Sequence, residues 1–296
     1  MEAQFVGESD GLIFWLARPQ DYDEVMAISQ YIYQGNDYLP HRYHTWMNEH
    51  ERVVIISRRN GKMRVTDRYI KQVYPSVTTK RLTRSDNPGP EKLSKFIFLA
   101  CRAILSFFGE AESFKGFVSG LKTKLESTEK SGGPSNNNQK VFVLKDSHQL
   151  KAILLDPDLS LRLQLPGGAI IQDWQPLKPV ESNLEILERR NLTWLVDCFI
   201  DKPMFMSFHT PPYPVPFNGG SLRFNIDMFG TDVSIAKKAL IAHLEQVIEE
   251  IHGTVVVHVY MPQTFWEAMR HFCEGDEGVK QWMYYWEQLF LEKEMP

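Results

Sequence analysis

The sequence predicts an α/β protein with mixed sheets, and three observations carry that prediction. Residues 222–272 alternate strand, helix, strand and helix, which is the order of a right-handed parallel crossover. Residues 12–57 show a strand, a helix, a short helix and a strand. Residues 126–140 contain no aliphatic or aromatic residue, which is typical of a linker. We therefore expect an N-terminal domain at residues 1–125 and a C-terminal domain at residues 141–296.

The composition predicts a soluble globular protein. Of 296 residues, 43% are hydrophobic and 24% are charged, and no apolar run reaches the roughly 18 residues of a membrane helix. The first residues lack the basic and apolar regions of a secretory signal. The three cysteines, Cys101, Cys198 and Cys273, are odd in number and far apart, which fits a reducing compartment. We expect a cytoplasmic protein with no membrane partner.

Positive charge is concentrated in one segment, although the net charge is −4. Residues 52–102 hold thirteen Lys and Arg against three acids. Such an excess suits nucleic acid, a phosphorylated cofactor or solvent alone. No helix here carries a base-reading motif, and no aromatic residues alternate with the basic ones. Nucleic acid is therefore the weakest of the three interpretations, and we expect no nucleic-acid partner.

The N-terminal domain begins with an apolar strand at residues 12–17. Asp21 and Glu24 stand three residues apart, which is the spacing of a capping box, so a helix should follow and end near Gly35. A polar and aromatic loop at residues 37–44 then leads to a short helix. We place that helix at residues 45–51.

The next residues predict the first strand and the turn of a β-hairpin, but they do not predict its second strand. The β-branched residues 53–57 indicate a buried strand, and Asn60-Gly61 is a strong two-residue turn signal. Residues 62–65 lead directly into a helical pattern at residues 66–74. We therefore expect the returning strand to be missing.

The rest of the chain is predicted from periodicity and from its Gly and Pro residues. We expect helices at residues 91–108, 111–124, 234–251, 264–272 and 278–292. We expect strands at residues 77–82, 141–144, 151–155, 159–165, 169–171, 222–229 and 254–260. Residues 185–198 form either a helix or a helix followed by a strand, and prolines in residues 210–216 predict a rigid extended loop.

Several motifs resemble a known family. The N-terminal part of a GNAT acetyltransferase is similar to residues 15–26, 38–41 and 58–62. The chain resembles the histidine N-acetyltransferase family more closely. The matching motifs lie at residues 66–76, 80–84, 88–95 and 170–176, and the likeness covers nearly the whole chain. The resemblance implies two tandem GNAT-like domains. It also implies transfer of acetyl from acetyl-CoA to the α-amine of free histidine, or a similar amino acid, by direct attack and without a metal.

The chain departs from that family at its centre. A GNAT enzyme binds the pyrophosphate of acetyl-CoA with backbone N–H groups of a Gln/Arg-x-x-Gly-x-Gly/Ala loop and of the helix behind it. That segment belongs between Lys62 and Thr66, where it is absent. We therefore expect the first domain to be incomplete and acetyl-CoA binding to be weak or absent. The alternative function is a catalytically inactive form that acts as a binding or regulatory protein.

Residues 164–169, Gln-Leu-Pro-Gly-Gly-Ala, match the loop pattern by letter. A phosphate-binding loop needs a helix directly behind it, whereas residues 170–176 have no helical stripe and end at a proline. We therefore expect a tight turn at residues 164–169.

Three residues are candidates for substrate binding. In GNAT enzymes the loop after the first helix faces the acceptor amine, and here that loop contains Asp37, Tyr38 and His41. An acid and an aromatic ring suit an amino acid with an imidazole. The alternative is that Asp37 caps a helix or turn and that Tyr38 packs in the core.

Cofactor contacts are assigned by resemblance alone. Asn87, Lys92 and Lys95 occupy positions similar to those that contact the pantetheine arm and adenosine phosphate, and solvent-facing lysines are the alternative. His41 and His44 have no nearby cysteine, so we expect no metal site. No catalytic residue can be assigned, because no nucleophile with a neighbouring base stands out.

Overall fold

The computed structural model describes residues 4–9, 11–29, 32–48, 54–59, 62–65, 97–131, 140–172, 175–199 and 202–292. The chain divides into two compact units. Unit 1 contains Met1–Leu99, Pro214–Gly220 and Phe290–Pro296, and unit 2 contains Ala100–Tyr213 and Ser221–Leu289. Both contain helices and sheets, which confirms the α/β class. None of the helices in the described ranges has the length and apolar character needed to cross a bilayer.

Unit 1 contains a sheet of four antiparallel strands in the order β1-β2-β3-β4. These are β1 (Phe5–Ser9), β2 (Leu12–Leu16), β3 (Ile55–Arg59) and β4 (Lys62–Val65). Its helices are α1 (Tyr22–Ser29) and α2 (Leu39–Asn48), with the 3-10 helices η1 (Pro19–Asp21), η2 (Ile32–Gly35) and η5 (Phe217–Gly219).

The prediction that the returning strand of the hairpin is missing is wrong. β4 pairs antiparallel with β3, with Arg59 opposite Lys62. A strand of four residues is too short to show a period-2 pattern, so only backbone pairing reveals it. The expected helix at residues 66–74 and strand at residues 77–82 lie outside the described residues.

The expectation of a loop at residues 37–44 is also mostly wrong, because α2 begins at Leu39 and runs to Asn48. Pro40 stands in its first turn, where a missing backbone N–H costs nothing. Tyr43 and Trp46 are buried from one face of this helix.

Unit 2 is built on a sheet in the order β14-β5-β13-β12-β10-β9-β6. Its strands are β5 (Ile97–Glu110), β6 (Phe142–Leu144), β9 (Thr193–Val196), β10 (Phe205–His209), β11 (Tyr213–Val215), β12 (Ser221–Gly230), β13 (Thr254–Met261) and β14 (Val279–Glu292), with the separate hairpin β7 (Ile170–Gln172) and β8 (Gln175–Leu177). Its helices are α4 (Ala111–Ser131), α5 (Ser147–Leu154), α6 (Leu159–Arg162), α7 (Glu181–Glu188), α8 (Val233–Ile248) and α9 (Trp266–Cys273), with η4 (Pro166–Gly168) and η6 (Gln263–Phe265).

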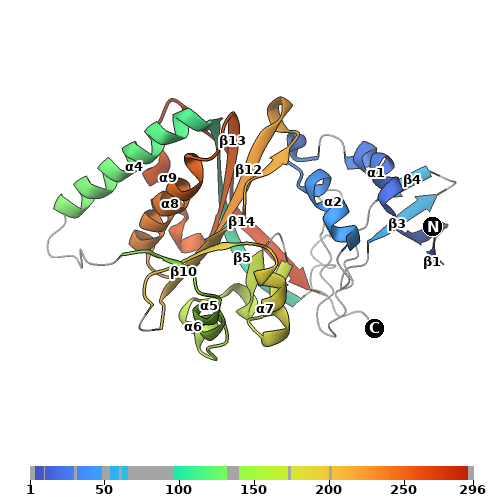
Figure 1. Ribbon diagram of the computed structural model, residues 1–296, viewed down its shortest axis with the longest axis horizontal. Helices are drawn as coiled ribbons and strands as arrows, with labels where there is room; N and C mark the ends of the chain where they lie inside the picture. The colour runs from blue at the N-terminus through green and yellow to red at the C-terminus, as the bar shows by residue number, and fades with distance from the viewer. Residues whose placement is uncertain are drawn as a thin grey trace. The chain divides into compact units, whose positions relative to one another are not determined.

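The predicted parallel crossover is confirmed. β12 and β13 pair in parallel and are joined by α8, whereas β10 and β5 flank them antiparallel. Asp232 caps α8 by accepting from the backbone N–H groups of Ser234 and Ile235. In Figure 1, α4, α8 and α9 lie on the same side of this sheet. Their apolar faces form one core with the inward residues of β5, β12 and β13.

A second core lies on the other face of β9 and β10. Helices α5, α6 and α7 bury leucines there against Trp194, Met206 and Phe208. Residues 151–155 and 159–165 were expected as strands, and the structure corrects both to α5 and α6. Asp146 caps α5, and Leu150 and Leu154, four residues apart, are both buried.

Two long strands replace predicted helices. Residues 97–110 form β5 and residues 279–292 form β14. A strand that is buried on both faces shows a continuous apolar run, which periodicity cannot distinguish from a buried helix. In β14 the aromatic residues happen to recur at helical spacing, and pairing with β5 decides the outcome.

Other expectations are settled in the same region. Residues 185–198 are a helix followed by a strand, α7 and β9. The turn at residues 164–169 is confirmed as η4, with Gly167 and Gly168 at positive φ. Helix α4 continues through Ser131 into the expected linker, whose residues 132–139 lie outside the described ranges.

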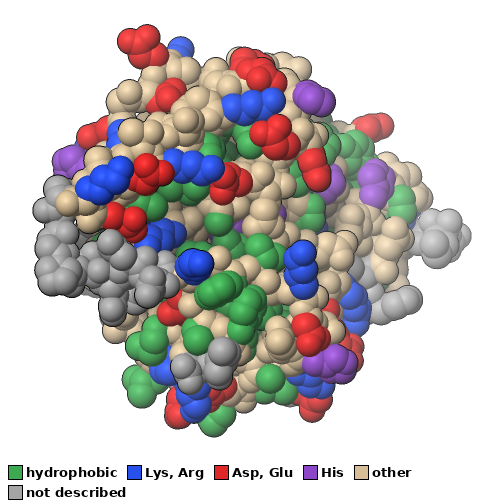
Figure 2. Space-filling model, turned by 60° about the vertical axis from the view of Figure 1, so that its left-hand side comes forward, with side chains coloured by type: hydrophobic (Ala, Val, Ile, Leu, Met, Phe, Trp, Pro, Cys, Tyr) green, Lys and Arg blue, Asp and Glu red, His purple; other side chains and the backbone are tan. Residues whose placement is uncertain are grey.

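Charges are mixed on the surface of unit 2. Figure 2 shows acidic and basic side chains interspersed over the upper part of one face. The ion pairs of α4, α8 and α9 include Lys115 with Glu112, Lys122 with Glu245, and Arg270 with Glu267. Exposed pairs contribute about 0–1 kcal/mol each, so the apolar core holds these helices in place.

Gly230 is required at the end of β12. It has φ 128°, and an added Cβ would lie 2.6 Å from the carbonyl oxygen of Met204. We expect Gly230→Ala to lower the free energy of unfolding by at least about 1–3 kcal/mol, as measured by chemical denaturation. The matched control is Gly120→Ala in α4, where nothing lies within 4 Å of the new methyl group. That variant should be more stable by about 0.5–1 kcal/mol, and equal effects of the two would contradict the prediction.

Candidate functional site

The three predicted substrate residues lie at the start of α2 in unit 1. Asp37 is 3% exposed, and its Oδ1 accepts from the backbone N–H of Leu39 at 3.2 Å. The ring of Tyr38 lies edge-on to Trp46, with centroids 5.9 Å apart. His41 is exposed on α2. The first two thus make the capping and packing contacts of the alternative interpretation, and their contact with an acceptor stays a prediction.

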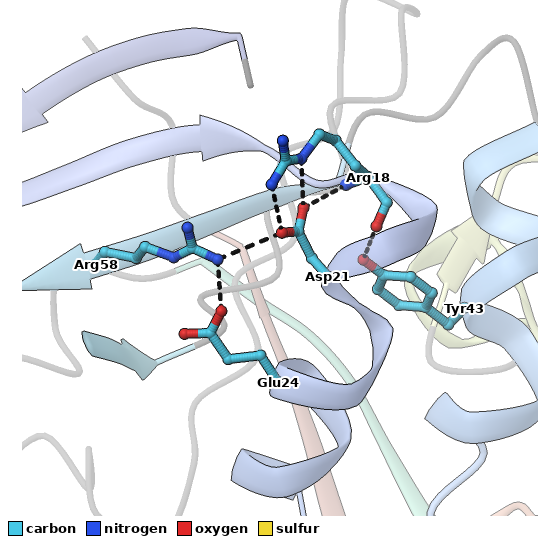
Figure 3. A network of polar contacts seen from close by, with 5 residues as sticks. All are labelled: Arg18, Asp21, Glu24, Tyr43 and Arg58. Carbon is cyan, nitrogen blue, oxygen red and sulfur yellow. Dashed lines mark hydrogen bonds and ion pairs between the residues drawn. The ribbon is translucent and has the colours of Figure 1, made fainter. Parts of the chain in front are cut away.

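A buried carboxylate holds the elements around that loop together (Figure 3). Asp21 is 4% exposed and accepts from Arg18 through its backbone N–H and two side-chain nitrogens, at 2.9–3.1 Å. Arg58 of β3 reaches Asp21 at 3.3 Å and Glu24 at 2.6 Å. Burial raises the pKa of Asp21, but the hydrogen bonds and charges of Arg18 and Arg58 outweigh it, so the net pKa is lowered. The carboxylate therefore stays ionised and joins β3 to the start of α1.

The same network positions α2. The hydroxyl of Tyr43 donates to the backbone oxygen of Arg18 at 2.7 Å. Burial raises the pKa of Tyr43 to about 12, so this phenol keeps its proton. The start of α2, with Asp37 and Tyr38, is thereby anchored to the turn before α1.

The predicted cofactor residues Asn87, Lys92 and Lys95 lie outside the described ranges. Within the part of the chain that the structure describes, no group of three or more His, Cys, Asp or Glu is arranged to hold a metal ion. The ring of His44 instead stacks on Tyr22, with centroids 4.8 Å apart.

In unit 2, the crossover between β12 and β13 has no phosphate-binding loop. Two residues, Thr231 and Asp232, separate β12 from α8. The carboxylate of Asp232 already accepts from the first N–H groups of α8, at 2.8 and 3.4 Å. An acid at this position repels a phosphate and occupies the groups that would bind it. This crossover is therefore unsuited to the pyrophosphate of a nucleotide.

Unit 2 carries a row of polar side chains on the face of its sheet opposite α8. The register of β12 and β13 places Asn225 beside His258 and Asp227 beside Tyr260, and the intervening residues belong to the apolar core. The row consists of Arg102, Ser106, Arg223, Asn225, Asp227, His258 and Tyr260, and each is at most 8% exposed. These residues form the polar cluster of unit 2.

An ion pair lies at the centre of this cluster. Nη1 of Arg102 donates to Oδ1 of Asp227 at 2.6 Å. The guanidinium lies 5.1 Å from the ring centroid of Phe229 and 5.5 Å from that of Tyr260. Arg223 donates to Oδ1 of Asn225 at 3.0 Å and to the hydroxyl of Tyr260 at 3.3 Å. The buried ring of His258 has a hydrogen-bond partner, since its Nδ1 lies 2.6 Å from Oγ of Ser106.

Sequence reasoning missed this cluster. In β12 the polar residues recur at every second position, which predicts a strand with a solvated face. The sequence pattern does not show that this face of β12 is buried. The one signal in the sequence is Arg102, a single basic residue within an apolar run.

A buried histidine pair lies beneath β10. Nδ1 of His209 is 2.8 Å from Nδ1 of His243, whose Nε2 is 2.8 Å from Oγ of Ser207. One imidazole must donate and the other accept, so the accepting ring must be neutral. Burial lowers the pKa of His209 to about 4 and the pKa of His243 well below its ordinary value.

This pair should make stability depend on pH. The unfolded chain binds these protons near pH 6.5, whereas the folded His209 binds its proton near pH 4. The free energy of unfolding is therefore at its full value above about pH 6.5 and falls as the pH is lowered toward about 4, by about 3 kcal/mol for His209 alone. We expect denaturant titrations across this window to show a smaller pH slope for His209→Asn. The exposed control His252→Asn should keep the wild-type slope, and an unchanged slope in His209→Asn would refute the assignment.

Comparisons with known proteins identify the class. Residues 137–262 match the family model described as "Histidine N-acetyltransferase, C-terminal". A human protein named "Probable N-acetyltransferase 16" is 31% identical, over 97% of this chain and 87% of its own length. The class is thus that of N-acetyltransferases.

Two further relatives define the family. The histidine N-acetyltransferase of Scomber australasicus is 32% identical, over 96% of this chain and 94% of its own length. That of Oreochromis niloticus is 32% identical, over 95% of this chain and 93% of its own length. The chain belongs to the histidine N-acetyltransferase family.

The relatives contain residues that this chain lacks. The alignments with the Scomber and Oreochromis proteins extend over 321 and 320 residues, more than the 296 residues of this chain. Positions without a counterpart here are what an internal deletion predicts. Where those positions fall in the alignment stays a prediction.

Among solved structures, yeast N-myristoyltransferase with bound myristoyl-CoA and inhibitors gives a TM-score of 0.40 at 10% identity, over 96% of this chain and 82% of that chain. A protein of unknown function from Staphylococcus epidermidis gives a TM-score of 0.34 at 9% identity, over 73% of this chain and 69% of that chain. Scores this low carry no argument about function.

Proposed function

We propose that this chain transfers the acetyl group of acetyl-CoA to the α-amine of free histidine, giving N-acetylhistidine. The observation that carries the proposal is the similarity to histidine N-acetyltransferases over nearly the full length of both chains. The α-amine attacks the thioester carbonyl, a C–N bond forms, the C–S bond breaks, and the ammonium proton is lost as the CoA thiolate takes one up.

Direct transfer is supported by the state of Cys273. Burial raises the pKa of Cys273 to about 12, so this thiol is neither ionised nor accessible at neutral pH. An acyl-enzyme on Cys273 is therefore disfavoured. Attack by the amine within a ternary complex needs only a deprotonated, oriented amine and a polarised carbonyl.

We also propose that the chain forms tandem GNAT-like domains at residues 1–125 and 141–296, with the acetyl donor bound by the first. The parallel pair β12 and β13 joined by α8 supports a GNAT-like second domain. The capped start of α8 argues against a pyrophosphate there. The donor site then depends on the segment that is expected to be missing near Lys62.

The test is an assay of the purified chain with acetyl-CoA at millimolar concentration and histidine, lysine or histamine as acceptor. Release of the CoA thiol is followed, and the product is identified by mass spectrometry and NMR. We expect slow formation of α-N-acetylhistidine, with lysine and histamine poorer acceptors. Equal rates with all three amines would refute the proposed acceptor.

A further inference from the structure

Among the described residues of the polar cluster, Arg102 has a buried side-chain nitrogen that lacks a hydrogen-bond partner. Its side chain is 2% exposed, and Nη1 is engaged by Asp227. Nη2 is buried and has no hydrogen-bond partner among the described residues. A buried guanidinium N–H that lacks an acceptor is unfavourable, so we expect a hydrogen-bond acceptor to bind at Nη2.

The surroundings of Arg102 are suited to an anion. The rings of Phe229 and Tyr260 lie beside the guanidinium and restrict its orientation. Arg223 adds a second cation on the same face of the sheet, and Asn225 and Tyr260 hold it in place. A planar, oriented guanidinium in a water-poor setting binds carboxylates strongly, because each N–H···O⁻ bond is charge-assisted.

We propose that Nη2 of Arg102 binds the α-carboxylate of the acceptor amino acid. This inference rests on the proposed function, since free histidine carries such a carboxylate. Asp227 is then a positioning residue, which holds the guanidinium through Nη1 and leaves Nη2 to the ligand. The site selects free amino acids over amines of the same shape that lack the negative charge.

The experiment combines a change in the protein with a change in the ligand. Binding of L-histidine and of L-histidinamide to the full-length chain is measured by calorimetry, because the amide keeps the α-amine and the imidazole but loses the charge. We expect the wild-type chain to bind histidine about 10- to 150-fold more tightly than histidinamide. In Arg102→Lys, which keeps a cation for Asp227 but loses the planar fork, this ratio should fall at least several-fold.

The control is Arg270→Lys on the exposed surface of α9, which should keep the wild-type ratio. Thermal melts show whether Arg102→Lys is folded. If it is not, the double variant Arg102→Met with Asp227→Leu replaces both charges by apolar groups and takes its place. A folded variant that retains the wild-type ratio overturns the proposal.

Binding and turnover separate the two proposals. If an Arg102-dependent preference for histidine is measured but no acetylhistidine forms, the carboxylate site stands and the proposed reaction fails. If acetylhistidine forms while the preference is independent of Arg102, the reaction stands and the site is overturned.

Discussion

Asp227→Asn should lower the free energy of unfolding of the full-length chain by about 3–5 kcal/mol. The substitution keeps the shape of the side chain but removes the charge that faces Arg102, whose guanidinium is 2% exposed. A buried cation that loses its partner cannot recover hydration, and the cost is therefore much larger than the net value of the pair. Chemical denaturation at neutral pH measures the change.

Two control variants make this prediction specific. Glu267→Gln removes an acid from Arg270 on the exposed surface of α9, and it should cost less than about 1 kcal/mol. The double variant Arg102→Met with Asp227→Leu removes both buried charges, and it should recover most of the stability lost in Asp227→Asn. If Asp227→Asn lowers the free energy of unfolding no more than Glu267→Gln does, the prediction for the buried pair of Arg102 and Asp227 is wrong.

Restoring the expected missing segment should raise the affinity for acetyl-CoA by about 10²- to 10⁴-fold. The change inserts, after Val65 at the end of β4, the corresponding segment of the Scomber relative, whose alignment is longer than this chain. A phosphate-binding loop would supply at least two charge-assisted hydrogen bonds of about 1.5–3 kcal/mol each, which gives this range. Calorimetry with CoA measures the affinity of both chains.

A Gly-Ser insertion of equal length at the same point is the matched control, and it should leave the affinity weak. Micromolar binding of CoA by the unmodified chain would show that the donor site is intact without the segment. A restored chain that binds CoA but does not acetylate histidine would instead count against the proposed acceptor.

Sequence reasoning succeeded where one element carries its own signals. Residues 222–260 were assigned correctly because the helix has a long apolar stripe between Gly230 and Gly253, and because β13 is rich in valine. These signals depend only on neighbouring residues and not on the elements that pack against them. The parallel crossover could therefore be predicted from the sequence alone.

It failed where partners decide the structure. The sequence of β5 and β14 predicts helices because their apolar residues also recur at helical spacing, and each becomes a strand through its place in the sheet. The short strand β4 was missed for a related reason, since a four-residue strand is defined by its pairing with β3.

The candidate sites divide in the same way. The placement of Asp37 and Tyr38 after the first helix was predicted from a motif, and the structure adds that both are buried and anchored through α2. Burial of Arg102 and Asp227 could not be read from their neighbours in the chain, because it depends on contacts between residues that are 125 positions apart.

By itself, the sequence determined the α/β class, the family and the crossover at residues 222–260, since composition, motifs and helical periodicity are properties of neighbouring residues. Only the tertiary structure decided that residues 97–110 and 279–292 are strands and that one face of the sheet buries two arginines. The physical reason is that burial and strand pairing are set by distant parts of the chain, and they override weak local preferences.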